Sequence, residues 1–152
     1  MKTLTFSGGI HPPKNKNLIK EAKIQEMPLP AKVILPLGQH IGAPAVSCVA
    51  KNDEVKTGQV IAEAGGFVSA PVHAAISGKV VDIKEMPHPV FGKGKAIIIE
   101  SDEKDEWVEL EGVEDWTSLS NDEIKEKVKN AGLVGLGGAT FPTHVKLSPP
   151  AE

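Results

Sequence analysis

The stretch NDEVKTGQVIAEAGGFVSAPVHAAISGKVVDI, residues 52–83, decides the fold. Its short β-branched runs are separated by Gly, Pro, Asn and Asp, the residues that favour turns. The opening Asn-Asp pair predicts a turn, Gly58 and Gly78 predict tight backbone corners, and Pro71 marks the entry to a strand. Because no segment of helical period lies between these runs, the stretch predicts a small barrel or sandwich rather than a βαβ sheet.

The same alternation of short β-branched runs and turn residues extends on both sides of this stretch, from residue 33 to about residue 100. The expected strands lie in KVILP (32–36), AVSCVAK (45–51), GQVIAE (58–63), KVVDIKEM (79–86) and KAIIIES (95–101). A weak internal repeat with an offset of twenty residues relates VKTGQVIAE (55–63) to AISGKVVDI (75–83). Such a repeat is expected if the two halves of a sandwich are quasi-symmetric.

Composition limits the remaining classes of protein. The 152 residues are 40% hydrophobic and 24% charged, which predicts a folded core, and with four Phe, two Trp and no Tyr that core must be aliphatic. A net charge of −3 without a basic stripe gives no reason to expect nucleic acid. No apolar run reaches signal-peptide or membrane-span length, so we expect a cytosolic or cytosol-facing protein with no membrane span. The single cysteine, Cys48, is predicted to be a small buried hydrophobe.

The two ends of the chain differ from the β-rich middle. Residues 1–31 are predicted to form an extended N-terminal arm and residues 102–119 an acidic connector, either a solvated segment or an edge strand near residues 107–110. One clear helix follows, because Ser120 and Glu123 make a capping box, apolar side chains recur on one face, and Gly132 is a natural terminator. The expected division is therefore 1–31, 32–101, 102–119 and 120–152.

The pattern V-x-x-G-Q-x-I-A-E, hairpin, S-A-P-V-x-A-x-x-S-G-x-V in residues 55–80 resembles the biotinyl/lipoyl-type barrel-sandwich hybrid. Carriers of that family attach their cofactor to a lysine at the hairpin tip. Here the tip reads EAGGF (63–67), Gly66 stands near the lysine position, and no lysine lies between Lys56 and Lys79. Without that amine no lipoate or biotin can be attached, so we expect a structural or docking module.

Three further strings sharpen the resemblance, namely FSGGIHPP (6–13), LPLGQHIGAPA (35–45) and GLVGLGGATFPTHVKL (132–147). In this order around a barrel-sandwich module they resemble the N-terminal part of the C subunit of the Rnf electron-transport complex. The A subunit of the sodium-translocating NADH:quinone reductase, which shares the module, is the alternative within the same class. A non-catalytic protein-interaction module with a glycine-rich tail is the alternative from another class.

The Rnf resemblance implies a peripheral subunit on the cytoplasmic face of the cell membrane. The complex exchanges electrons between ferredoxin and NAD(H) and couples the transfer to Na⁺ or H⁺ translocation. FMN and [4Fe–4S] clusters are implied for the complete subunit, of which this chain is expected to be a fragment ending in a truncated α/β flavoprotein domain. One cysteine cannot ligate a cluster, so the clusters are expected outside these residues. We expect the fragment to be inactive and to bind neither FMN nor NADH appreciably.

The glycine-rich string matches the family's flavin loop, G-x-G-G-A-x-F-P-T-x-x-K. The resemblance implies flavin contacts in the complete subunit from Gly135, Gly137, Gly138, Ala139, Phe141, Thr143 and Lys146, with Pro142 fixing the exit of the loop. Small residues let backbone N–H groups approach a phosphate, and a lysine adds a positive charge. Two positions depart from the pattern: Leu136 replaces an arginine, and Thr140 replaces a glycine where positive φ would be strained. Without the family, the loop is equally consistent with a connector between helices.

The five histidines show no metal-ligand spacing, and His73 is predicted to be structural. The GGIHPP motif of residues 8–13 has two interpretations, a loop that reaches the flavin domain or a rigid strap over the barrel.

Overall fold

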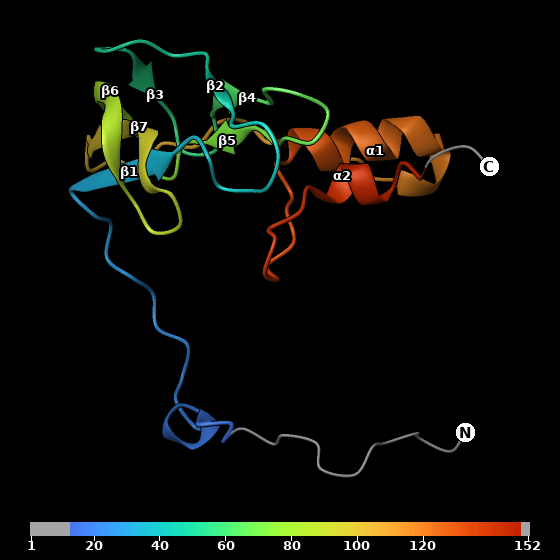
Figure 1. Ribbon diagram of the computed structural model, residues 1–152, viewed down its shortest axis with the longest axis horizontal. Helices are drawn as coiled ribbons and strands as arrows, with labels where there is room; N and C mark the ends of the chain where they lie inside the picture. The colour runs from blue at the N-terminus through green and yellow to red at the C-terminus, as the bar shows by residue number, and fades with distance from the viewer. Residues whose placement is uncertain (1–12, 150–152) are drawn as a thin grey trace.

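The computed structural model describes residues 13–149, which form two small antiparallel sheets and a pair of C-terminal helices (Figure 1). The fold is mainly β and has the two-sheet architecture of a barrel-sandwich hybrid, so the predicted fold class is confirmed. Most of the GGIHPP motif, including His11, lies outside the described residues. Residues 13–26 extend away from the barrel (Figure 1), with one short 3₁₀ turn, η1, at Lys16–Leu18.

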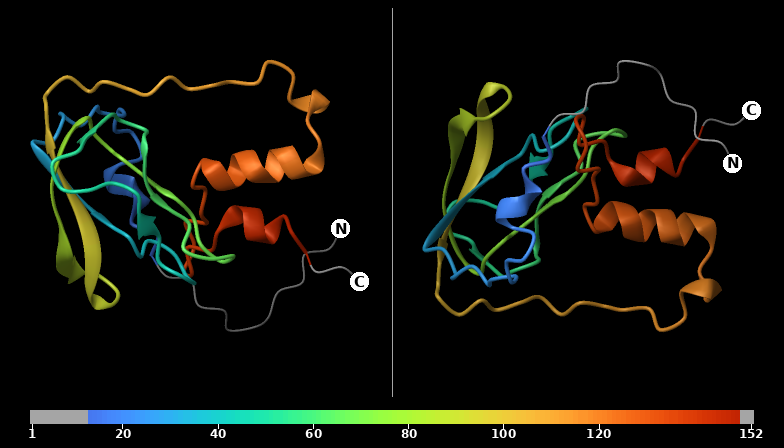
Figure 2. Two further views of the ribbon diagram at one scale, coloured as in Figure 1. Left: turned by 90° about the horizontal axis from the view of Figure 1, so that it is seen from above. Right: turned by 90° about the horizontal axis from the view of Figure 1, so that it is seen from below.

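The larger sheet has the strand order β1-β7-β6-β3. Its strands are β1 at Lys32–Pro36, β3 at Glu54–Val55, β6 at Gly78–His88 and β7 at Gly92–Ser101. The long β6–β7 hairpin pairs Gly78 with Ser101 at its base and His88 with Gly92 at its turn. This hairpin reaches beyond the rest of the sheet (Figure 2), so its turn is free to form part of a site.

The smaller sheet has the order β2-β4-β5, with β2 at Val46–Ser47, β4 at Val60–Glu63 and β5 at Val72–His73. The two segments of the weak internal repeat, 55–63 and 75–83, lead into β4 and β6, which belong to different sheets, as two quasi-symmetric halves require. Gly58 precedes β4 with φ 82°, and Gly78 is the first residue of β6 with φ 149°. A Cβ at Gly78 would collide with the carbonyl oxygen of Glu100, so this corner needs glycine.

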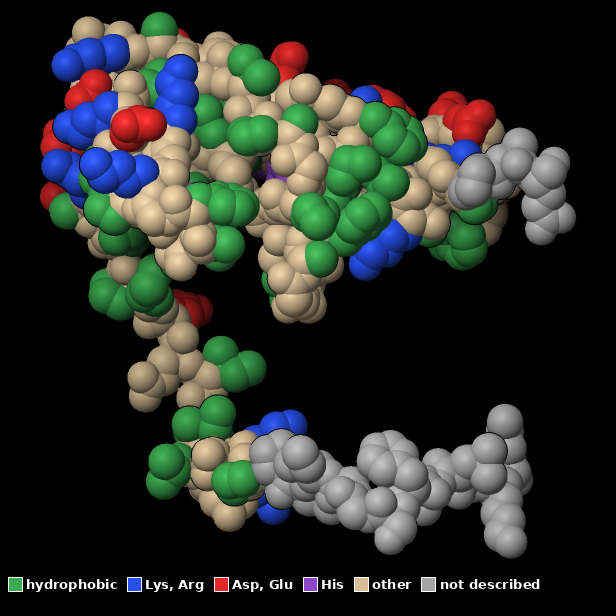
Figure 3. All heavy atoms as spheres, viewed as in Figure 1, with side chains coloured by type: hydrophobic (Ala, Val, Ile, Leu, Met, Phe, Trp, Pro, Cys, Tyr) green, Lys and Arg blue, Asp and Glu red, His purple; other side chains and the backbone are tan. Residues whose placement is uncertain are grey.

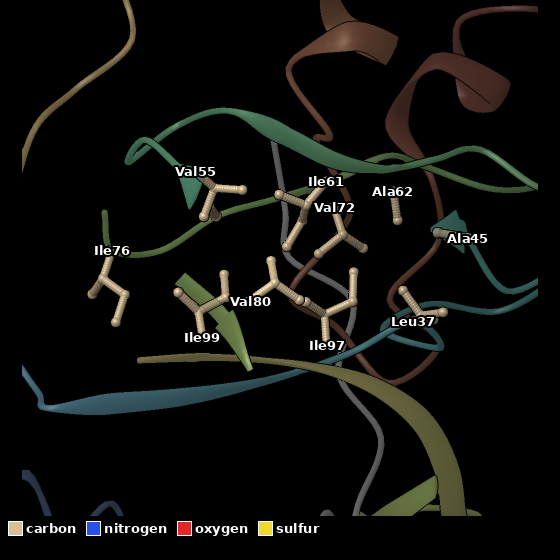
Figure 4. Close-up of a cluster of buried hydrophobic side chains, with 11 residues drawn as sticks. Leu37, Ala45, Val55, Ile61, Ala62, Val72, Ile76, Val80, Ile97 and Ile99 are labelled. Atoms are coloured by element: carbon tan, nitrogen blue, oxygen red, sulfur yellow. The ribbon is translucent and has the colours of Figure 1, made fainter. Parts of the chain in front are cut away.

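The core lies between the two sheets (Figure 4) and is aliphatic, as predicted. Ile61 comes from β4, Val80 from β6, and Ile97 and Ile99 from β7, and all four are fully buried. Each such side chain contributes about 1.5–3 kcal/mol of burial free energy, which makes this cluster the main support of the barrel.

The prediction that Cys48 is buried is wrong, because its side chain is exposed. Residues alternate between the two faces of a strand, and here Ser47 and Val49 point inward while Val46 and Cys48 point outward. Val49 packs against the core instead. Partial burial, followed by the negative charge of Glu63, raises the pKa of the Cys48 thiol, so this exposed cysteine is a weak nucleophile at neutral pH.

The acidic connector is fastened to the barrel at its start. The Ser77 hydroxyl donates to the Asp102 carboxylate at 2.6 Å, and this bond is the main reason why the pKa of Asp102 lies below its ordinary value. Of the alternative edge strand only a single parallel bridge forms, between Thr57 and Trp107. The connector then runs along one side of the molecule (Figure 2) through the 3₁₀ turn η2 at Trp116–Ser118.

The predicted helix is α1, Asn121–Asn130, and its capping box between Ser120 and Glu123 is confirmed. The helix ends as expected, with Gly132 at φ 66°. A second short helix, α2 at Thr143–Lys146, is not predicted by the sequence pattern and lies beside α1 (Figure 2). The glycine-rich loop is therefore the connection between two helices that pack together.

Candidate functional site

The glycine-rich loop is a closed turn with its own hydrogen bonds. The Gly135 N–H donates to the Phe141 carbonyl at 2.9 Å, and the Thr143 N–H donates to the Leu133 carbonyl at 2.9 Å. Val134 and Pro142 form an antiparallel bridge between the same two arms. These bonds order the loop within this chain and carry residues 136–140 to its tip.

The tip presents free backbone donors. Within residues 13–149, no acceptor pairs with the amides of Gly137, Gly138 and Ala139. A Cβ placed at Gly137 or Gly138 would meet no atom within 4 Å, so the space above these amides is open. Three consecutive free amides suit an anion such as a phosphate. Gly135 differs, because its own amide is already engaged.

Lys146 lies at the base of the loop. Its Nζ is 5.8 Å from the centroid of the Phe141 ring and would be 3.1 Å from a Cβ at Gly135. It is exposed and makes no ion pair with any residue from 13 to 149. The absence of a side chain at Gly135 thus leaves room for a free ammonium group, while Thr143 starts α2 and holds the returning chain.

Thr140 has φ 43°, in the left-handed region that favours glycine. A β-branched residue in this region costs about 1–2 kcal/mol. Its N–H donates to the Gly137 carbonyl at 3.0 Å, which closes the tip. The strain that the sequence suggested at this position is therefore present.

The loop tip faces the barrel across a recess (Figure 3), and a cavity of about 560 Å³ lies between them. Three segments line it: residues 35–41, which run from the end of β1 into the following loop, residues 88–91 at the β6–β7 turn, and residues 138–140 of the glycine-rich loop. The Ile41 N–H donates to the Ala139 carbonyl at 3.3 Å and joins the first segment to the last. Sequence reasoning missed this barrel wall, although the LPLGQHIG string and the apolar pair Val90-Phe91 within a turn were signals for it.

His40 fixes the first of these segments. It is 6% exposed, its Nε2 accepts from the Ala70 N–H at 3.0 Å, and its Nδ1–H donates to the Ile41 carbonyl at 3.0 Å. A neutral ring protonated on Nδ1 satisfies both contacts. His40 therefore ties the segment that touches the glycine-rich loop to the strand entry at residues 69–71.

His88 organises the β6–β7 turn in a similar way. Its Nε2–H donates to the Gly38 carbonyl at 2.9 Å, and its Nδ1 accepts from the N–H groups of Val90 and Phe91 at 3.1 and 3.2 Å. Its ring stacks on Phe91 with 4.8 Å between centroids. His88 thus fixes the backbone of Val90 and Phe91 and packs against the Phe91 ring beside the cavity.

The hairpin tip of residues 64–68, where carriers bear their lysine, is held down. The Gly65 N–H donates to Ser69 Oγ at 3.0 Å, and the Ala43 N–H donates to the Val68 carbonyl at 3.0 Å. His144 of α2 reaches the Phe67 carbonyl with Nε2 at 3.3 Å. The tip therefore serves as a contact for the C-terminal helices, in a geometry unlike that of a mobile carrier arm.

The remaining candidate residues are separate from one another. His73 is half-buried in β5 against Gly132, and His144 is 7% exposed, with no partner for its Nδ1 in the described part of the chain. Among residues 13–149 no group of three or more His, Cys, Asp or Glu side chains is placed to hold a metal ion. No helix in the same range is long and apolar enough to cross a membrane.

Comparison with known proteins gives the family. The RnfC barrel sandwich hybrid domain matches residues 4–104. The chain is 52% identical over 149 residues to the C subunit of the proton-translocating ferredoxin:NAD(+) oxidoreductase complex of Clostridium ljungdahlii, covering 97% of this chain and 33% of that protein. It is 46% identical over 149 residues to the C subunit of the Na(+)-translocating ferredoxin:NAD(+) oxidoreductase complex of Acetobacterium woodii, covering 97% of this chain and 34% of that protein.

A third relative, the C subunit of the ion-translocating oxidoreductase complex of Pseudomonas aeruginosa, is 45% identical over 150 residues, which cover 97% of this chain and 19% of that protein. The chain thus spans about a third or less of the length of these relatives. The matched family decides between the two resemblances drawn from the sequence in favour of Rnf over the NADH:quinone reductase.

Proposed function

Because this chain belongs to the RnfC family, we propose that it serves as the N-terminal module of a peripheral subunit in an ion-translocating ferredoxin:NAD oxidoreductase complex. The match runs through the barrel, the connector and the glycine-rich loop at 52% identity, and this is the observation that carries the proposal. Its relatives are named for proton translocation in one case and for Na⁺ translocation in another. Either coupling ion is compatible with these residues.

In this proposal the glycine-rich loop is the first part of a flavin site that the complete subunit finishes. The free amides of Gly137, Gly138 and Ala139 and the unpaired ammonium of Lys146 fit the phosphate of FMN. Phe141 and Thr143 hold the geometry of the loop, and Gly135 makes room for the lysine. Bound FMN would supply one- and two-electron transfer, and these residues would bind and orient it.

The chain does not fit an iron–sulfur cluster. One cysteine is present, and no cluster of ligands occurs among residues 13–149. In the proposed complex any [4Fe–4S] centres therefore belong to other residues, and the barrel is a docking element. The proposed division is an arm at 1–31, the barrel module at 32–101, a connector at 102–119 and the start of the flavin domain at 120–152. We place the module on the cytoplasmic face, in contact with other subunits, and the complete complex takes NAD(H) and ferredoxin as its partners.

A chimera tests this proposal. In the Clostridium ljungdahlii relative, the segment aligned with this chain is replaced by this chain, and ferredoxin-dependent NAD⁺ reduction is measured in membranes. The expected result is activity comparable with that of the unmodified complex. As a control, Ile97→Asp places a charge in the fully buried core and should abolish assembly. A chimeric subunit that reaches the membrane in normal amount and supports no activity would refute the proposal.

A further inference from the structure

The cavity between the barrel and the glycine-rich loop has the size and lining of a small-molecule site. Its volume of about 560 Å³ lies within the ordinary range of ligand pockets, which is about 300–1,000 Å³. Within the described chain, its walls carry no Asp, Glu, Lys or Arg side chain. Most of the lining is aliphatic, glycine or aromatic, so the cavity favours an uncharged and largely apolar group.

Phe91 gives the cavity a flat aromatic surface. Its side chain is 66% exposed, yet the bonds to His88 and the stack between the two rings hold it in one position. Here the turn is built to keep one face available, and a planar ring is the group that stacks best on such a face.

Other parts of the cavity lining carry little side-chain bulk. Gly38 lies near Phe91, since a Cβ there would be 3.8 Å from the phenyl Cε2 atom. Gly138 borders open space, and Ala139 adds one methyl group. The same two loop residues belong to the set of free amides, so the anion-binding tip and the cavity share an edge.

We infer that this cavity binds the planar heteroaromatic ring of a nucleotide, stacked on Phe91, while the glycine-rich loop binds the phosphate of the same ligand. The inference rests on the proposed function, which assigns the loop to a nucleotide, and it adds a barrel wall to that site. A flavin or a nicotinamide nucleotide carries the required ring and phosphate. The aromatic side chain is the specificity element, and His88 is a positioning residue that holds it.

Amide chemical shifts of the 152-residue chain test the inference, with FMN, NADH and inorganic phosphate as separate probes. Because the chain holds only part of the proposed site, binding is expected to be weak, and FMN or NADH at millimolar concentration should shift the amides of residues 38–41, 90–91 and 138–140. Phosphate alone should shift only the tip at residues 137–139. A response to FMN but not NADH identifies a flavin, and the reverse identifies a nicotinamide nucleotide. A phosphate response that includes residues 90–91, or no response of residues 90–91 to either nucleotide, would overturn the inference.

Two matched variants locate the ring. Phe91→Ala should weaken nucleotide binding by at least about fivefold, as expected for loss of one stacking contact, and leave the phosphate response unchanged. Phe67→Ala removes a phenylalanine of similar exposure, 71%, that does not line the cavity, and it should bind like the wild type. Equal affinities of the Phe91→Ala and Phe67→Ala variants would also overturn the inference.

The two proposals fail in different ways. If the wild-type chimera described above is active and the Phe91→Ala chimera binds its flavin and nicotinamide nucleotides equally well, the ring site is refuted and the proposed function stands. If the wild-type chimera is assembled but inactive, the proposed function itself is refuted, whatever the titrations show.

Discussion

His40→Ala is the substitution that most directly perturbs the wall of the site. The ring is 6% exposed and connects the Ala70 N–H with the Ile41 carbonyl. Removing it leaves a buried N–H without its acceptor, and such a group costs about 1–3 kcal/mol. Adding the lost packing of the ring, we expect a loss of about 2–3 kcal/mol from a total unfolding free energy of about 5–15 kcal/mol.

Denaturant unfolding measures this free energy, and a chain of this length should also lose about 4–12 °C in melting temperature. Hydrogen exchange gives the local result, in which the amides of Ala70 and Ile41 lose protection first. His40→Gln retains an acceptor and a donor and should recover part of the loss. His73→Ala is the matched control, because the half-buried His73 side chain makes no hydrogen bond to any described residue, and this change should cost less than about 1 kcal/mol. Equal costs for the His40→Ala and His73→Ala variants, or unchanged exchange at Ala70, would refute the reasoning.

Three further changes test neighbouring features by thermal or denaturant unfolding. Gly65→Ala should destabilise by more than about 1 kcal/mol, because the new Cβ would collide with a backbone carbonyl. Gly66→Ala should be nearly neutral, because the nearest atom to its Cβ would be 3.3 Å away. Similar values for the two variants would contradict the inference that the hairpin tip is held down. Thr140→Gly should stabilise by about 0.5 kcal/mol, since relief of left-handed strain exceeds the added chain entropy, and a loss of stability would count against that strain. Ser120→Ala should cost about 1 kcal/mol at neutral pH. The Ser120 hydroxyl also donates to the Glu123 carboxylate and lowers its pKa, so the part of the stabilisation that comes from this bond is present above about pH 4.3 and fades as the pH falls through the lowered value. A cost independent of pH between about 7 and 3 would contradict this part.

The features that could be predicted from the sequence are local ones. Gly58 and Gly78 mark corners because only glycine adopts these backbone angles without strain. The capping box of α1 depends on two residues that are three positions apart, so it is recognisable in any context. The strands of the larger sheet follow from runs such as KAIIIES, whose apolar side chains have no alternative to burial.

The features that could not be predicted depend on distant residues or on which face of a strand points inward. The alternation of side chains in AVSCVAK does not show which face of the strand points inward. In the structure Val49 packs against the core, so Cys48 points outward. The cavity wall needs the β6–β7 turn to meet the segment at Gly38, which is fifty residues from its partner His88. The helix α2 follows a proline and has only four residues, too short for a periodic signal.

The central claim is that the glycine-rich loop of this chain holds the phosphate of a flavin once the rest of the subunit is present. The most direct measurement is the flavin content of the purified chimeric subunit, taken from its visible absorbance per protein. The wild-type chimera should carry FMN in stoichiometric amount. A chimera with Gly138→Val and Lys146→Ala together, which blocks the free amides and removes the cation, should lose it while remaining folded. Equal flavin content in the two proteins would contradict the account.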